Sequence, residues 1–158
     1  MPILEDYWEQ LQTLHEGIER AIEGLPQAAW DWAPGPDMNS LAVLIVHVAG
    51  AERYWIGDVA GRDPSARDRA AEFRTRGVDG AVLKRRLTEV LSHSRAVLEK
   101  LTLSELEELR VSPRDGRQFT VAWSLAHALE HTALHLGHIQ ITRQLWQQLQ
   151  ADRDFTAD

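Results

Sequence analysis

Apolar residues recur at intervals of three and four along most of this chain, which is the spacing of an amphipathic α-helix. Leu4, Leu11 and Ile18 mark the first such face, with acidic residues between them. Residues 41–49 are instead apolar almost all round, as expected for a helix buried inside a bundle. Segments rich in Gly, Pro and charged residues separate these stretches. The pattern predicts helices over residues 3–25, 39–60, 81–101 and 120–150, a short helical turn over 102–107 and a frayed tail over 151–158.

Four long helices around one core predict an all-α fold, a four-helix bundle. Asn39 and Ser40 are both good N-cap residues for the second helix. Residues 61–77 are polar and charged, so we expect a long crossover there, with room for a short helix. Residues 112–117 predict a turn. The length of 158 residues predicts a single domain over residues 1–158.

The composition of the chain argues against some classes of binding partner and of chemistry. The net charge of −7 and the pI near 5.5 argue against binding to nucleic acid or to an anionic membrane. The absence of cysteine excludes disulfides, thiolate metal ligands and a cysteine nucleophile. The N-terminus lacks the features of a signal peptide, and no apolar run has transmembrane length. We therefore expect a cytoplasmic protein without a nucleic-acid or membrane partner. Composition leaves a small-molecule substrate and a homodimer open.

Four of the seven histidines, His127, His131, His135 and His138, lie within twelve residues near the C-terminus. On an α-helix they fall inside an arc of roughly 80°. Imidazole is a common metal ligand, so this row predicts a metal site rather than a helix face that is merely rich in histidine. His131 is four residues from both His127 and His135, while His135 and His138 are three apart. Spacing alone leaves open which pair binds the metal.

A third ligand is expected outside the row. His47 lies in the most apolar stretch of the chain, and an unpaired polar side chain buried there costs several kcal/mol. It is either a core histidine bonded to a carbonyl or carboxylate, or a metal ligand, and the histidine row favours the ligand. Three protein ligands with one open position are typical of a catalytic site. Residues 131–135 lack the glutamate of the His-Glu-x-x-His motif, which argues against a zincin-type peptidase.

Two segments carry a resemblance to a known family. Residues 39–57, NSLAVLIVHVAGAERYWIG, resemble the second helix of the DinB/YfiT-like superfamily, and residues 123–140, WSLAHALEHTALHLGHIQ, resemble its metal-binding last helix. The order of the other helices fits too. The resemblance implies a four-helix bundle with a long crossover. It also implies a divalent metal ion (zinc, nickel or iron) held by His47, His131 and His135.

Some relatives in that superfamily transfer low-molecular-weight thiols, or use them to isomerise or detoxify electrophiles. The position of His131 is often Glu in the branch that resembles mycothiol-dependent enzymes, and His in the bacillithiol-transferase-like branch. In the latter branch the position of His138 is commonly Gln, so this chain mixes features of the two.

Three neutral imidazoles leave the full charge on the metal, which lowers the pKa of a bound thiol or water. We therefore predict a metal-dependent enzyme that transfers a low-molecular-weight thiol, as co-substrate, to a small electrophile. The alternatives are a metal-dependent hydrolase and a non-catalytic metal-binding or structural stress protein.

The sequence predicts the roles of five further residues less specifically. His127 and His138 share the ligand face, where they either support the ligands by hydrogen bonds, transfer a proton or contact the substrate, or simply pack at the mouth of the bundle. Glu52 is either a hydrogen-bond acceptor for a ligand or an exposed or dimer-interface charge. Tyr54 and Trp55 are expected in the core or in a pocket wall.

Overall fold

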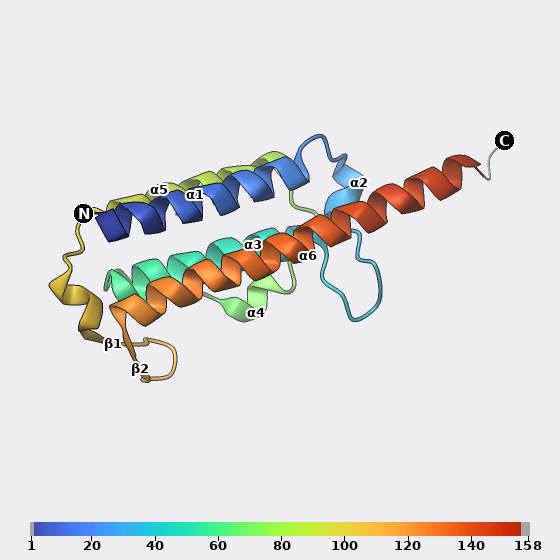
Figure 1. Ribbon diagram of the computed structural model, residues 1–158. Helices are drawn as coiled ribbons and strands as arrows, with labels where there is room; N and C mark the ends of the chain where they lie inside the picture. Colours follow the sequence, from blue (N-terminus) through green and yellow to red (C-terminus); the bar gives the residue numbers. More distant parts are fainter. Residues whose placement is uncertain (1, 156–158) are drawn as a thin grey trace.

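The computed structural model describes residues 2–155, apart from the side chain of residue 154, and consists mainly of four long helices (Figure 1). In chain order the elements are α1 (Pro2–Ile22), α2 (Gln27–Trp30), α3 (Leu41–Glu52), the π-helix η1 (Arg53–Ala60), α4 (Arg69–Glu72), α5 (Gly80–Leu98), the 3-10 helix η2 (Ser104–Glu107), β1 (Leu109–Val111), β2 (Gln118–Thr120) and α6 (Val121–Phe155).

The four long helices pack as a bundle in which α1 contacts α5 and α6, and α3 contacts the same two helices. Figure 1 shows α1 and α6 running in one direction, while α3 and α5 run in the other. Because α3 and α5 are parallel, residues 61–79 must travel back along the bundle between them. The predicted four-helix bundle with a long crossover is confirmed, and α4 is the short helix within that crossover.

Helix α3 is the most buried element, as its apolar sequence predicts. Ile45 on α3 and Leu83 and Leu87 on α5 are among the side chains that are fully buried in the core. Burial of each such side chain contributes about 1.5–3 kcal/mol. The hydroxyl of Ser40 accepts a hydrogen bond from the amide of Val43, at 3.3 Å, which confirms the predicted N-cap. Helix α3 is therefore held in place by its buried side chains and by its N-cap.

One short helix and a two-stranded hairpin were not predicted. Helix α2 follows Pro26, and its Trp30 is buried in the core. Strands β1 and β2 pair antiparallel, with Arg110 opposite Phe119. The turn expected over residues 112–117 is the loop of this hairpin, and Gly116 adopts a φ of 71° there.

The last helix is longer than expected. It continues to Phe155, past the end predicted near residue 150, so residues 151–155 of the predicted frayed tail are helical, and residues 156–158 of that tail lie outside the described part. Arg153 lies in the last turn, where a positive charge interacts favourably with the helix dipole. Figure 1 shows this end of α6 projecting beyond the bundle. Within residues 2–155, no helix is both long and apolar enough to cross a membrane.

Candidate metal centre

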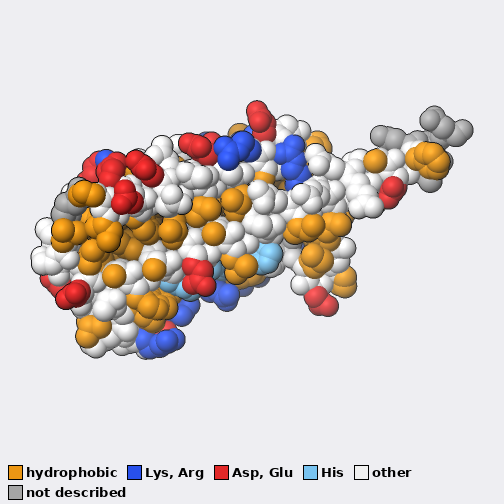
Figure 2. Space-filling view, viewed as in Figure 1, with side chains coloured by type: hydrophobic (Ala, Val, Ile, Leu, Met, Phe, Trp, Pro, Cys, Tyr) orange, Lys and Arg blue, Asp and Glu red, His pale blue; other side chains and the backbone are white. Residues whose placement is uncertain are grey.

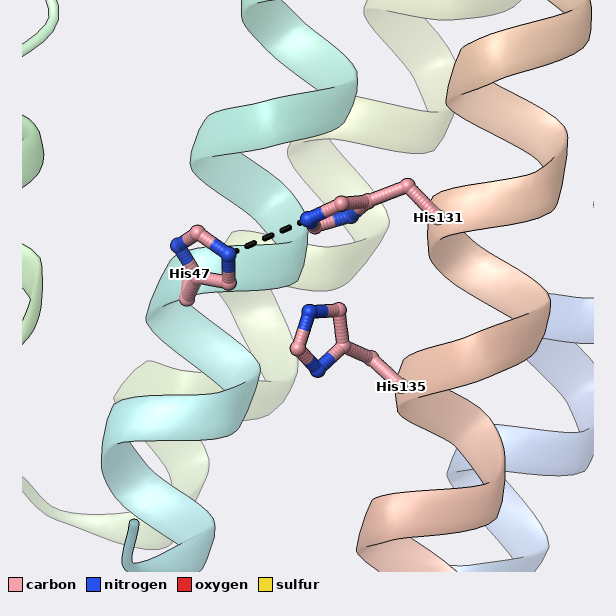
Figure 3. A group of neighbouring side chains, drawn as sticks. All are labelled: His47, His131 and His135. Carbon is pink, nitrogen blue, oxygen red and sulfur yellow. Dashed lines mark hydrogen bonds between the residues drawn. The ribbon is translucent and has the colours of Figure 1, made fainter.

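Three histidine rings from two packed helices converge on one point. His47 comes from α3, and His131 and His135 come from successive turns of α6. One ring nitrogen from each lies within 4.8 Å of the other two, in an arrangement that could hold a metal ion. Figure 3 shows the three rings facing one another across the gap between the helices. The structure thus brings together the three residues that the resemblance implied as ligands.

The hydrogen bonding of these rings fits a divalent cation. Nδ1 of His47 lies 2.9 Å from Oε2 of Glu72, and an ionised carboxylate only accepts hydrogen bonds. The neutral ring of His47 therefore carries its proton on Nδ1 and directs the lone pair of Nε2 toward His131, whose Nε2 is 3.1 Å away. Two nitrogens bound to one tetrahedral zinc ion lie about 3.3 Å apart. An imidazole donor set of this kind suits zinc, nickel and iron.

Burial keeps two of the rings neutral. Desolvation, together with the nearby charges of His135 and His47, lowers the pKa of His131 to about 3. Desolvation likewise lowers the pKa of His135 to about 4, together with the charge of His47. Because an ordinary histidine has a pKa of 6.5, both rings have their lone pairs available at neutral pH.

Glu72, on α4 in the crossover, fixes the orientation of His47. Its carboxylate also accepts hydrogen bonds from Arg67, at 2.5 Å from Nε and 2.8 Å from Nη2. Burial raises the pKa of Glu72, but the hydrogen bonds from Arg67 and His47 outweigh it and leave the pKa below its ordinary value. Carboxylates that hold a ligating histidine in this way fix its tautomer and raise its basicity.

Sequence reasoning missed Glu72 and gave more attention to Glu52. Glu52 is buried, so its interpretation as an exposed charge is wrong. Its oxygens contact Nε2 of His15 and the hydroxyl of Ser94, each at 2.6 Å, and do not contact His47. Glu72 lies among many charged residues of the crossover, and no spacing in the sequence distinguishes it from them.

A sequence model of the mycothiol-S-transferase family matches residues 7–148. The chain belongs to this family. The resemblance to the DinB/YfiT-like superfamily is thereby confirmed. A comparison with curated protein sequences finds no match.

Solved structures with the fold of this mycothiol-S-transferase family member have low sequence identity to it. A conserved protein from Enterococcus faecalis is 17% identical, with a TM-score of 0.72 over 92% of this chain and 97% of the other. YfiT from Bacillus subtilis is described as a probable metal-dependent hydrolase with an unusual four-helix bundle topology. It is 15% identical, with a TM-score of 0.69 over 89% of this chain and 86% of YfiT. A mycothiol-dependent maleylpyruvate isomerase is 14% identical, with a TM-score of 0.65 over 84% of this chain and 59% of the isomerase. These likenesses show the shared fold.

In this member of the mycothiol-S-transferase family, His127 and His138 lie outside the three-histidine group. The ring of His127 stacks on Trp123, with centroids 4.8 Å apart, and meets the buried Trp55 edge-on. His138 is exposed, and its Nδ1 lies 3.2 Å from Nδ1 of His135. This contact leaves Nε2 of His135 free to bind a metal. Tyr54 and Trp55 are buried, as expected for core or pocket wall.

Proposed function

We propose that this protein is a metal-dependent enzyme that transfers a low-molecular-weight thiol to a small electrophile. In this proposal His47, His131 and His135 hold a divalent cation. The observation that carries it is the convergence of three ring nitrogens within 4.8 Å. Among the described residues, this three-member group has no fourth imidazole or carboxylate in it, and an open position is what a catalytic site requires. Membership of the mycothiol-S-transferase family supports thiol transfer as the reaction.

The protein's own residues prepare the site. Glu72 holds the proton of His47 at Nδ1, and Arg67 in turn fixes the carboxylate of Glu72. Burial keeps His131 and His135 neutral by lowering their pKa values. When bound, a divalent cation supplies its positive charge, which lowers the pKa of a coordinated thiol toward neutrality.

The reaction then needs a route for one proton. The thiol loses its proton, the sulfur forms a bond to the electrophilic carbon, and the leaving group departs with the electrons of its bond. In this proposal His138, which is exposed and contacts His135, passes that proton to solvent.

The test is a thiol-transfer assay on zinc-loaded protein, with mycothiol as the thiol and the fluorogenic reagent monochlorobimane as the electrophile. We expect the wild type to accelerate adduct formation and His131→Ala to return the rate to the uncatalysed level. His93→Ala is the matched control, because His93 pairs with Asp63 on another part of the surface and should leave the rate unchanged.

Bacillithiol replaces mycothiol in a parallel assay, because the sequence carries features of both the mycothiol-dependent branch and the bacillithiol-transferase-like branch. Equal rates for the wild type and His131→Ala with both thiols would contradict the proposal. Ester hydrolysis that needs His131 but no thiol would identify a hydrolase instead.

A further inference from the structure

A cavity of about 400 Å³ lies beside the three-histidine group and is lined by several positive side chains. Three separate segments contribute to it: the π-helix η1, the crossover and the loop of the β-hairpin. Figure 2 shows Lys and Arg side chains gathered next to histidines along one edge of the molecule. The lining residues that matter here are Tyr54, Asp58, Ala66, Arg67, Arg69 and Arg114.

The positive charges of this arginine cavity are only partly balanced. Arg67 is paired with Glu72, whereas Arg69 has no salt bridge among the described residues and stacks on Phe73, 4.7 Å from the ring centroid. Arg114 has only a partly exposed partner, Asp115, at 3.4 Å.

Asp58 does not balance the remaining charge. One of its oxygens accepts hydrogen bonds from Arg53 and from the amide of Ser65, and the other accepts one from the hydroxyl of Ser65. Its own charge is already paired with Arg53, so the cavity keeps an excess of positive charge.

Bringing these positive charges together is unfavourable, because they repel one another. The guanidinium groups of Arg67 and Arg114 lie 5.7 and 5.8 Å from the centroid of the buried Tyr54 ring. Cation–π attraction offsets part of the repulsion between them. Ala66, directly before Arg67, adopts a φ of 53°, which is strained for a residue other than glycine. Strain and like charges concentrated at one cavity are typical of a binding site that awaits an anion.

The cavity shares a wall with the candidate metal centre. Nη2 of Arg67, which lines the cavity, is 3.5 Å from Nδ1 of His47. The ring of Phe73 lies between Arg69 and His47: its centroid is 4.7 Å from Cζ of Arg69 and 4.8 Å from the ring centroid of His47. A small molecule held in the cavity is therefore one side chain away from a ligand of the metal.

We propose that the arginine cavity binds a carboxylate group of a reactant, with the guanidinium groups of Arg69 and Arg114 donating the hydrogen bonds. Guanidinium matches the planar carboxylate and binds it with two parallel N–H···O bonds. The volume suits a small organic acid. That this acid takes part in a reaction at the metal centre rests on the proposed function; its binding in the cavity does not. The enzyme then prefers acidic over neutral reactants.

The experiment measures binding of succinate to the zinc-free protein by NMR titration, with the uncharged succinamide as a matched probe. Zinc is left out because a carboxylate also binds zinc directly. We expect succinate to bind and succinamide not to bind. Arg69→Gln and Arg114→Gln should each weaken succinate binding about tenfold, since each removes a charge-assisted hydrogen bond. Arg76→Gln, an exposed arginine outside the cavity lining, should leave the affinity unchanged.

Three results would overturn the proposal: no binding of succinate, equal binding of succinamide, or binding that ignores both arginine substitutions. If succinate bound only in a second titration with zinc present, and Arg69→Gln did not weaken that binding, the carboxylate would be on the metal instead. Failure of the thiol-transfer assay beside intact, arginine-dependent succinate binding would reject the proposed function and leave the cavity as an acid-binding site.

Discussion

Glu72 determines how His47 presents its ring nitrogen to the other two histidines. The carboxylate lies between His47, at 2.9 Å, and the guanidinium group of Arg67. This chain of contacts fixes the proton of His47 on Nδ1 without placing another charge in the three-histidine group. The affinity of the site for metal should therefore depend on Glu72, although Glu72 is not itself a member of the group.

Replacing Glu72 with Gln removes the charge but keeps the shape of the side chain. We expect Glu72→Gln to weaken zinc binding about 10- to 100-fold, because His47 loses its fixed tautomer and part of its basicity. Competition with a chromophoric chelator measures this change. Glu89→Gln, on the exposed face of α5, is the control and should bind zinc as the wild type does. Equal affinities for the two variants would refute this role of Glu72.

The lowered pKa values of His131 and His135 predict a shallow pH dependence of metal binding. With pKa values of about 3 and 4, against an ordinary 6.5, both rings stay unprotonated as the pH falls from neutrality. Protons therefore do not compete with the metal at these two rings until the pH approaches 4. Zinc titrations across roughly pH 5 to 7 should show a loss of affinity well below two log units per pH unit. A slope of two or more would show that these histidines titrate normally.

At the scale of single elements, the long helices were predictable because each follows from a local period of apolar residues. Helix α2 and the hairpin are too short to show a period, and distant contacts fix them instead. The ring of Trp30, for example, packs directly against Gly80, where an added Cβ would lie only 2.6 Å from it. The extension of α6 to Phe155 was missed because residues 151–155 lack an apolar face.

The N-cap of α3 should contribute measurably to the stability of the protein. Ser40→Ala removes the side-chain acceptor for the amide of Val43, so we expect the protein to lose about 1 kcal/mol of stability. For a chain of this size, that corresponds to a fall in Tm of about 2–4 °C. Thermal unfolding followed by circular dichroism measures it. Thr88→Ala, at an exposed position on α5, is the control. An unchanged Tm for Ser40→Ala would show that the cap does not stabilise the helix.

For the whole molecule, the sequence revealed the part of the candidate site that lies on long helices. The period of the histidine row identified one face of α6, and the apolar surroundings of His47 singled out a residue 84 positions away from His131. Glu72 and the arginine cavity could not be predicted, because charged residues in a crossover or a hairpin loop look like ordinary surface until the fold brings them against α3 and η1. Their roles depend on tertiary structure alone.

The metal content of the purified protein, after loading with zinc and exhaustive dialysis, tests the three-histidine site most directly. We predict about one ion per chain for the wild type and for His127→Ala, because His127 lies outside the three-histidine group. His47→Ala and His135→Ala should each lose the ion while keeping their helical circular dichroism. Retention of zinc by both of these variants, or a wild type that retains none, would contradict the central claim.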